Sequence, residues 1–308
     1  MAVIETPVAG RPAVPGPDPP FALSVDVEDY YQVEAFARVV PRDEWDRFPS
    51  RVERNTDALL DLFDETGQRG TFFTLGWIAR RQPALVKRIA ARGHEVASHG
   101  MSHRMLTELT PALFQAEARD SKALLEDLSG TPVTGFRAPS YSVGEGTLWA
   151  LEVLAGAGYT YDSSIYPIRR GRYGYPAGPL QPVRMSAGSH GSIAEFPMPT
   201  VPFGPIRMPV LAGAYLRLFP RWVSLAATRW HRDRGLPFVA NVHPWEIDPA
   251  QPTIGRSRLA AWTHYARLGR TEGTLRAVLR SAQFAPVAVR LRELGLLAGD
   301  AAPGAAAS

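Results

Sequence analysis

Short apolar, β-branched runs alternate along the chain with longer amphipathic segments. The runs bounded by Gly, Pro or polar residues predict buried strands over residues 21–27, 70–76, 94–98, 134–137, 159–162 and 237–242. The amphipathic segments predict helices over residues 51–65, 83–91, 110–128, 148–156, 211–232, 257–268 and 271–281. Strands and helices that alternate in this way are typical of parallel βαβ units. The pattern therefore predicts an α/β fold, either a barrel or a doubly wound sheet.

The alternation stops between residues 167 and 209, where Gly, Pro, Arg and Tyr dominate. We expect long surface loops there, of the kind that shape a substrate cleft. Exposed aromatic side chains in and around these loops could stack on the rings of a ligand, or merely pack the loops together; they are Tyr166, Tyr173, Tyr175 and Phe203.

The ends of the chain differ in composition from its middle. Residues 1–20 are rich in proline, and residues 298–308 are mostly alanine and glycine, so both are expected to be disordered tails. Residues 21–297 are expected to form one domain, with a helical extension from about residue 250. We find no signal peptide and no apolar stretch long enough to span a bilayer, which predicts a cytoplasmic location and no membrane span.

Composition narrows the possible chemistry. The chain contains no cysteine, which excludes disulfides, thiolate metal sites and a cysteine nucleophile. Any metal must therefore be bound by His, Asp or Glu. The formal net charge is only +4, and the basic residues are mixed with acidic ones, so no nucleic-acid partner is expected.

Three carboxylates stand at the end of the first predicted strand. Alternation along a strand places Asp26 and Glu28 on one face, while Val25 and Val27 enter the core, and Asp29 lies just past the strand. Carboxylates this close repel one another unless a cation or an arginine neutralises them. A metal or catalytic site is therefore one interpretation, and a solvated turn is the commoner one.

Two histidines, His99 and His103, are spaced i and i+4. On a helical turn this spacing brings both imidazoles to one side, at a distance suited to a metal. A chance pair of surface histidines has the same spacing. A third histidine, His94, begins a predicted strand away from this turn, and we expect it to be structural.

Two further candidates follow predicted strands. Arg137 precedes a proline turn and could pair with a carboxylate in a fork geometry, although a surface salt bridge is the simpler alternative. His243 could act as an acid or base, or could be a packing residue. Together with Asp26 and His99, both stand at or just after strand ends, the edge on which α/β enzymes assemble their sites.

In this order, the motifs resemble the polysaccharide deacetylase superfamily, of the carbohydrate esterase family 4 or NodB-like type. The stretches that carry the resemblance are SVDVEDY (24–30), TFFTLGW (71–77), HEVASHGMSH (94–103), GFRAPSY (135–141) and VHPWE (242–246). In detail they are similar to the branch associated with exosortase-linked exopolysaccharide loci. The resemblance implies an irregular (β/α) barrel and a hydrolase that removes N-acetyl groups from amino sugars of a polysaccharide or its precursor.

The resemblance also implies roles for individual residues. His99 and His103 would bind a divalent metal, usually zinc, together with Glu28 or Asp29, and the strand-face argument favours Glu28. The remaining roles implied are catalytic base for Asp26, an orienting group for Arg137, general acid for His243, and substrate binding for Tyr141, Trp77 and Trp245. An N-acetylated oligosaccharide or polysaccharide would be the substrate.

Two other functions stay open at this point. The same fold and metal chemistry would serve another hydrolase of carbon–nitrogen bonds, such as a deformylase or a ring-opening amidase. A catalytically silent carbohydrate-binding protein would keep the groove, but it would not need a base, an acid and a metal pair together.

Overall fold

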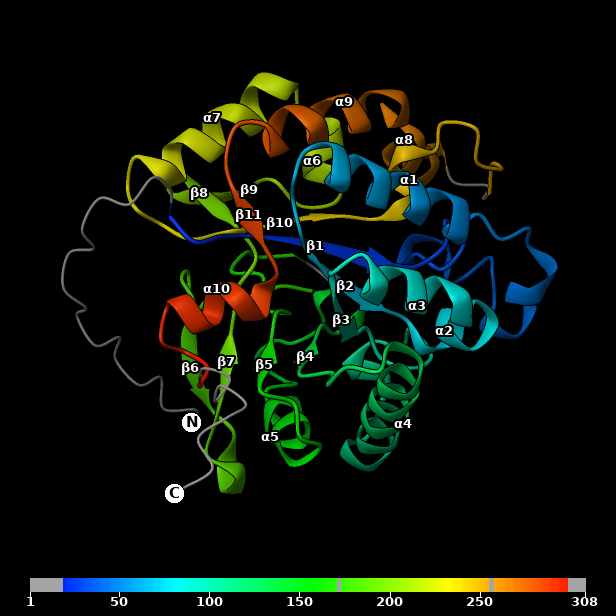
Figure 1. Cartoon of the computed structure of the whole chain (residues 1–308), viewed down its shortest axis with the longest axis vertical. Helices are drawn as coiled ribbons and strands as arrows, with labels where there is room; N and C mark the ends of the chain where they lie inside the picture. Colours follow the sequence, from blue (N-terminus) through cyan, green and yellow to red (C-terminus); the bar gives the residue numbers. More distant parts are fainter. Residues whose placement is uncertain (1–18, 171–172, 255–257, 299–308) are drawn as a thin grey trace, which may run out of the picture.

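The computed structural model describes residues 19–170, 173–254 and 258–298 (Figure 1). Its centre is a curled sheet in the order β10-β1-β2-β3-β4-β5-β7-β6, in which β11 also pairs with β1. The strands are β1 (Phe21–Val27), β2 (Thr71–Thr74), β3 (Glu95–Ser98), β4 (Gly135–Phe136), β5 (Tyr161–Asp162), β6 (Val183–Ser186), β7 (Ser192–Glu195), β10 (Val239–Val242) and β11 (Phe284–Ala285). Neighbours from β10 to β7 run parallel, and only β6 pairs antiparallel. The predicted α/β barrel architecture is confirmed, in a form closed around only part of its circumference.

Helices pack around this sheet, as the coloured ribbons of Figure 1 show. They are α1 (Val52–Glu65), α2 (Gly76–Arg81), α3 (Pro83–Ala91), α4 (Pro111–Ser129), α5 (Trp149–Gly156), α6 (Ala214–Leu218), α7 (Arg221–Arg232), α8 (Arg258–Tyr265), α9 (Leu268–Leu279) and α10 (Val287–Glu293). The start of α4 illustrates why a helix begins where it does: the Thr110 hydroxyl accepts the Leu113 N–H and Pro111 occupies the first turn.

Successive side chains of β1 point alternately to the core beneath the helices and to the interior of the half-barrel. All seven of its residues are buried, as expected for a central parallel strand. Leu23, Val25 and Val27 belong to the main apolar core with the helices. The intervening positions therefore face inward, and this orientation points Ser24 and Asp26 into the half-barrel.

The expectation of long loops between residues 167 and 209 is wrong. This segment contains β6 and β7, and a separate two-stranded sheet of β8 (Thr200–Phe203) and β9 (Ile206–Pro209). Each of these four strands is only four residues long, and β8 and β9 each contain a proline, so their apolar alternation is too short to recognise in the sequence. Pairing with distant strands stabilises these short segments as strands, as when β7 pairs with β5. Pro202 and Pro209 are tolerated because β8 and β9 are both edge strands of a two-stranded sheet.

Other boundaries also differ from expectation. The helix predicted over residues 211–232 is two helices, because Pro220 cannot donate to a preceding turn and begins α7. Helices α2 and α10 and strand β11 were not predicted. Residues 1–18, 299–308 and the expected helix start at Ser257 lie outside the described residues, as do the side chains of residues 258–261. Within the part that is described, no helix is long and apolar enough to cross a membrane.

A buried acid pair joins β5 to β7. Asp162 and Glu195 stand opposite each other in the sheet, and both are fully buried. The Ser164 hydroxyl donates to Asp162 Oδ1 at 2.6 Å, and the Ile165 N–H donates to Glu195 Oε1 at 2.9 Å. Burial raises the pKa of Asp162 to about 6, and burial together with the Asp162 charge raises the pKa of Glu195 well above its usual value. The pair therefore retains a proton near neutral pH.

We expect Glu195→Gln to flatten the pH dependence of stability. The folded-state pKa values are raised, so the stabilisation is complete below about pH 4 and is lost as the pH rises through about 6. The amide of the variant can donate a hydrogen bond to Asp162 and does not ionise. Between pH 5 and pH 8, the free energy of unfolding should therefore fall by about 2 kcal/mol less in the variant than in the unchanged protein. Urea unfolding of both proteins at pH 5, 6.5 and 8 measures this. Equal losses in the two proteins would contradict the assignment.

Candidate active site

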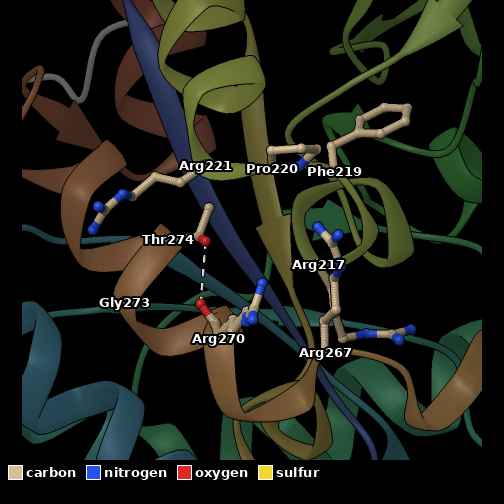
Figure 2. Close-up of a pocket in the computed structure, with 8 residues that line it drawn as sticks. All are labelled: Arg217, Phe219, Pro220, Arg221, Arg267, Arg270, Gly273 and Thr274. Carbon is tan, nitrogen blue, oxygen red and sulfur yellow. Dashed lines mark hydrogen bonds between the residues drawn. The ribbon is translucent and has the colours of Figure 1, made fainter.

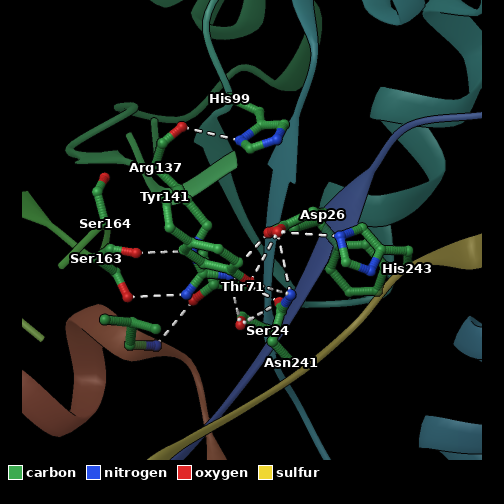
Figure 3. Close-up of polar contacts among 12 residues, drawn as sticks. Ser24, Asp26, Thr71, His99, Arg137, Tyr141, Ser163, Ser164, Asn241 and His243 are labelled. Atoms are coloured by element: carbon green, nitrogen blue, oxygen red, sulfur yellow. Dashed lines mark hydrogen bonds and ion pairs between the residues drawn. The ribbon is translucent and has the colours of Figure 1, made fainter. Parts of the chain in front are cut away.

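The polar side chains singled out in the sequence meet at one edge of the sheet (Figure 3). Asp26 is the second-last residue of β1, His99 follows β3, Arg137 follows β4 and His243 follows β10. These strands are parallel and lie close together in the sheet order, so their carboxyl ends open on the same side. The arrangement brings together residues as far apart in sequence as Asp26 and His243.

A group of three potential metal ligands lies at this edge. One ligand atom from each of Glu28, His99 and His103 lies within 4.8 Å of the others, and all three residues are buried. Glu28 Oε2 is 2.6 Å from His103 Nε2, yet it has no contact with the geometry of a hydrogen bond. A buried carboxylate and a buried imidazole this close are suited to sharing a cation. The side chains present thus fit a divalent metal.

The surroundings orient two of these side chains, those of His99 and Glu28. His99 Nδ1 lies 2.9 Å from the Arg137 carbonyl, which accepts its N–H and leaves Nε2 free as a ligand atom. Burial lowers the pKa of His99 to about 4 despite the nearby Asp26 charge, so the imidazole is neutral. The Trp245 indole N–H donates to Glu28 Oε1 at 3.2 Å. Each contact fixes a ligand before any ion arrives.

The histidine pair does not lie on a helical turn, so that part of the sequence reasoning is wrong. Residues 99–103 form an irregular loop in which His103 has a φ of +55°. The start of α2 holds this loop: the Gly76 N–H donates to the Gly100 carbonyl at 2.9 Å, and a Cβ at Gly76 would lie 2.5 Å from Met101 Sδ. Backbone packing, instead of helical periodicity, brings the two imidazole rings to 5.3 Å centroid separation.

Asp26 is held ionised from several sides. Arg137 Nη1 donates to its Oδ1 at 2.8 Å, and Asn241 Nδ2 donates to its Oδ2 at 3.0 Å. The Tyr141 hydroxyl donates to the same Oδ2 at 3.4 Å, and His243 Nε2 lies 3.6 Å from it. Burial opposes ionisation, but the positive charge of Arg137, with smaller contributions from the histidines, lowers the pKa of Asp26 to about 2.

Arg137 is the centre of a buried network. Its Nη1 donates to Ser24 Oγ at 2.8 Å and to Asn241 Oδ1 at 2.7 Å, in addition to Asp26. Its Nε and Nη2 bind the Ser163 carbonyl and hydroxyl, both at 2.8 Å. The expected fork on a carboxylate is therefore wrong, because a single nitrogen contacts Asp26 and the two-nitrogen contact goes to Ser163.

His243 lies between two carboxylates. Its Nδ1 is 3.0 Å from Glu246 Oε2, whose other oxygen accepts from Arg217 Nε at 3.2 Å. Its Nε2 faces Asp26 and also lies 3.7 Å from Glu28 Oε1. Burial lowers the affinity of the ring for a proton, but the hydrogen bond and charge of Glu246 outweigh it and raise the pKa of His243 to about 9. The Glu246 carboxylate therefore favours the protonated imidazole.

Several candidate residues lie elsewhere or have other contacts. The Asp29 carboxylate accepts the N–H groups of Arg51 and Val52 at the start of α1, so the structure places Glu28 and not Asp29 in the ligand group. Trp245 is only 6% exposed and stacks on His243, which leaves it little surface for a substrate. Trp77 packs edge-on against neighbouring aromatic rings.

The tyrosines of the former loop region divide between core and surface. Tyr166 is buried, contrary to expectation, and its ring contacts those of Tyr141 and Tyr173. Tyr141, which has a φ of +52°, and Tyr173 both line an open cavity of about 440 Å³. A second cavity of about 390 Å³ reaches His103. The second cavity therefore reaches the ligand group, and the first reaches Tyr141, whose hydroxyl contacts Asp26. His94 packs between Phe rings, as its structural assignment predicts.

Four supporting residues were not recognised in the sequence. Ser24 and Asn241 each stand two residues before a candidate, Asp26 and His243, so strand alternation would place them on the same face. Glu246 is part of the VHPWE motif but was assigned no role. Ser163 carries no local signal, since its contact with Arg137 depends on the pairing of distant strands.

Comparisons with known proteins relate part of the chain to a known family. Residues 44–161 match the family model described as polysaccharide deacetylase. This segment, about two fifths of the chain, is similar to the polysaccharide deacetylases. Residues 163–291 match a domain of unknown function. β5 begins at the last residue of the first matched segment and β7 lies in the second, yet the two strands are neighbours in one sheet.

Named relatives of this superfamily share part of the chain. A peptidoglycan deacetylase-like protein of Gibberella zeae is 33% identical over 120 residues, which are 38% of this chain and 34% of that protein. A chitooligosaccharide deacetylase of a Bradyrhizobium species is 34% identical over 101 residues, 32% of this chain and 43% of the relative. The chain thus spans less than half the length of these curated relatives.

A solved structure covers nearly the whole deacetylase fold. The crystal structure of a Mycobacterium smegmatis protein named as a polysaccharide deacetylase has a TM-score of 0.59 and 22% sequence identity. The alignment covers 93% of this chain and 96% of that one. The likeness establishes the fold.

We expect Arg137→Lys to destabilise the deacetylase fold by about 3 kcal/mol, because one ammonium cannot replace the contacts to Asp26, Asn241 and Ser163 and leaves buried groups unpaired. Arg88→Lys is the matched control, since Arg88 pairs with acids at a partly exposed surface and should change stability by less than about 1 kcal/mol. Denaturant unfolding measures both. Similar small losses would show that the network is not structural.

Proposed function

We propose that this protein is a metal-dependent N-deacetylase that acts on amino sugars of an exopolysaccharide or its precursor. The observation that carries the proposal is the buried group of Glu28, His99 and His103 beside an ionised Asp26 and a cationic His243. A hydrolase of an amide needs an activated water, an acceptor for the proton of that water and a donor for the departing nitrogen. This edge of the sheet offers a residue for each task.

The ligand set supports a divalent metal and favours zinc. Two imidazoles and one carboxylate are the protein ligands of many catalytic zinc sites. Glu28, His99 and His103 would hold the ion, and the Arg137 carbonyl and the Trp245 indole would keep two of these ligands in position. A bound ion would polarise the acetyl carbonyl and acidify a water molecule.

Asp26 and His243 are assigned to opposite proton transfers. Asp26 is ionised and accepts the proton of the attacking water at its Oδ2, the oxygen that faces His243 and Tyr141. His243 carries a proton on Nε2, because Nδ1 is committed to Glu246, and gives it to the departing nitrogen. Arg137 keeps Asp26 in place and ionised.

The surroundings of this edge suit a sugar. The cavity of about 440 Å³ is lined by Tyr141 and Tyr173, whose rings offer faces on which pyranose rings stack. Names of the relatives refer to peptidoglycan and chitooligosaccharide deacetylases, which act on N-acetylated sugars. The motif resemblance to exopolysaccharide loci favours an exopolysaccharide as the substrate here.

Product analysis tests the proposal. The purified protein, loaded with zinc, is screened for acetate release from N-acetylated oligosaccharides, and Asp26→Asn should lower the rate by about 10²- to 10⁴-fold with metal content unchanged. Release of formate, or an opened ring from a cyclic amide, would instead favour another carbon–nitrogen hydrolase. Unchanged acetate release by Asp26→Asn would overturn the assignment of the base.

Metal content tests the ligand set separately. Glu28→Gln should lose most of its bound zinc, because the amide removes the only negative charge among the three ligands. Asp29→Asn is the matched control: its side chain binds backbone at the start of α1, so zinc should be retained while stability falls. Elemental analysis of dialysed proteins measures both. Full zinc content in Glu28→Gln would remove Glu28 from the site.

A further inference from the structure

An apolar face is exposed where α7 meets the β8–β9 hairpin. Three of its side chains project into solvent: Phe203 and Ile206, paired across the hairpin, are 64% and 60% exposed, and Trp222 in the first turn of α7 is 70% exposed. A groove of about 400 Å³ between hairpin and helix is lined almost entirely by apolar side chains, among them Val201, Met208 and Trp230. Contiguous apolar surface of this kind marks an interaction site.

A pocket lined by arginines adjoins this groove (Figure 2). It has a volume of about 390 Å³, and its charged lining residues are Arg217, Arg221, Arg267 and Arg270. Figure 2 shows Arg217 and Arg270 in the middle of the view, with the guanidinium groups of Arg221 and Arg267 pointing to opposite sides. Phe219 lines both the arginine pocket and the apolar groove, so the two form one continuous face.

The positive charge of the pocket is not neutralised by the described part of the protein. Arg217 is buried and paired with Glu246, but Arg221, Arg267 and Arg270 are exposed, and their side chains make no ion pair or hydrogen bond with described residues. No acidic residue lines the pocket. The acid of α9, Glu272, is already paired with Arg276. Three arginines without a described counter-charge therefore line this pocket, which favours an anion.

We propose that this face docks the protein onto an anionic lipid surface. The exposed rings of Phe203 and Trp222 and the Ile206 side chain enter the interface between headgroups and acyl chains, and the arginine pocket binds a headgroup phosphate. Aromatic and basic side chains on one face are the combination by which peripheral proteins bind anionic membranes. Binding here does not depend on the proposed deacetylation.

Other occupants fit less well. A free phosphate would use the arginines but leaves the exposed apolar side chains unexplained. A second copy of the chain in a two-fold contact would bury the apolar side chains, but it would bring the same arginine-rich face of both copies together, where like charges repel. An anionic bilayer offers acyl chains to the apolar side chains and phosphate groups to the arginines.

Vesicle sedimentation with the full chain tests the proposal. The protein should bind vesicles containing phosphatidylglycerol, bind phosphatidylcholine vesicles far more weakly, and be released by high salt. Trp222→Ser should weaken binding by about fivefold or more, and Arg221→Gln and Arg270→Gln by about fivefold each. Trp262→Ser and Arg119→Gln are the matched controls, since these exposed residues line neither pocket, and both should bind like the unchanged protein.

Three outcomes would overturn the proposal. One is equal binding to both kinds of vesicle, or none to either. Another is binding of inorganic phosphate by the unchanged protein with no effect of Trp222→Ser on vesicle binding, which would indicate a site for soluble anions. The third is a dimer in light scattering that Trp222→Ser converts to a monomer. Thermal unfolding of each variant verifies its fold, and neither acetate release nor zinc content enters the result.

Discussion

The site depends on one buried guanidinium. Arg137 is fully buried, and its three nitrogens join groups from β1, from β10 and from the segment after β5. A buried cation is costly unless its charge and all its N–H groups are satisfied, so these elements are held where they can satisfy it. Asp26 supplies the counter-charge and in return is kept ionised. The same contact thus fixes the sheet edge and prepares the proposed base.

Around this centre, the backbone adopts conformations that the surrounding packing must enforce. His103, Ser140 and Tyr141 all have φ near +55°, a region that residues other than glycine rarely occupy. His103 belongs to the ligand group, and Ser140 and Tyr141 lie in a short 3-10 turn after β4, from which the Tyr141 hydroxyl contacts Asp26. Strain of this kind persists where neighbouring structure over-determines it, and it is concentrated at functional sites.

The sequence predicted the parts of the molecule that depend on local pattern. The strand ending at Val27 and the helix over 83–91 follow from apolar periodicity and match the structure. The candidates Asp26, His99, Arg137 and His243 were found because each stands at a strand end, and parallel pairing brings them to one edge.

What the sequence could not supply depends on contacts between distant segments. β6 to β9 become strands only through pairing partners, and Ser163 reaches Arg137 across the fold. The loop conformation that brings His103 close to His99 could not be predicted from the local sequence either, because it depends on hydrogen bonds from the start of α2.

The order of synthesis has a consequence for how this edge of the sheet forms. β1 leaves the ribosome early, but Asn241, which binds Asp26, is 215 residues further along the chain. At typical translation speeds this is a delay of roughly ten to forty seconds. During that time one side of β1 lacks β10 and β11, its partners in the finished sheet. An apolar strand with an open edge is a template for aggregation, so chaperone binding to nascent chains should concentrate in the interval before residue 242 emerges.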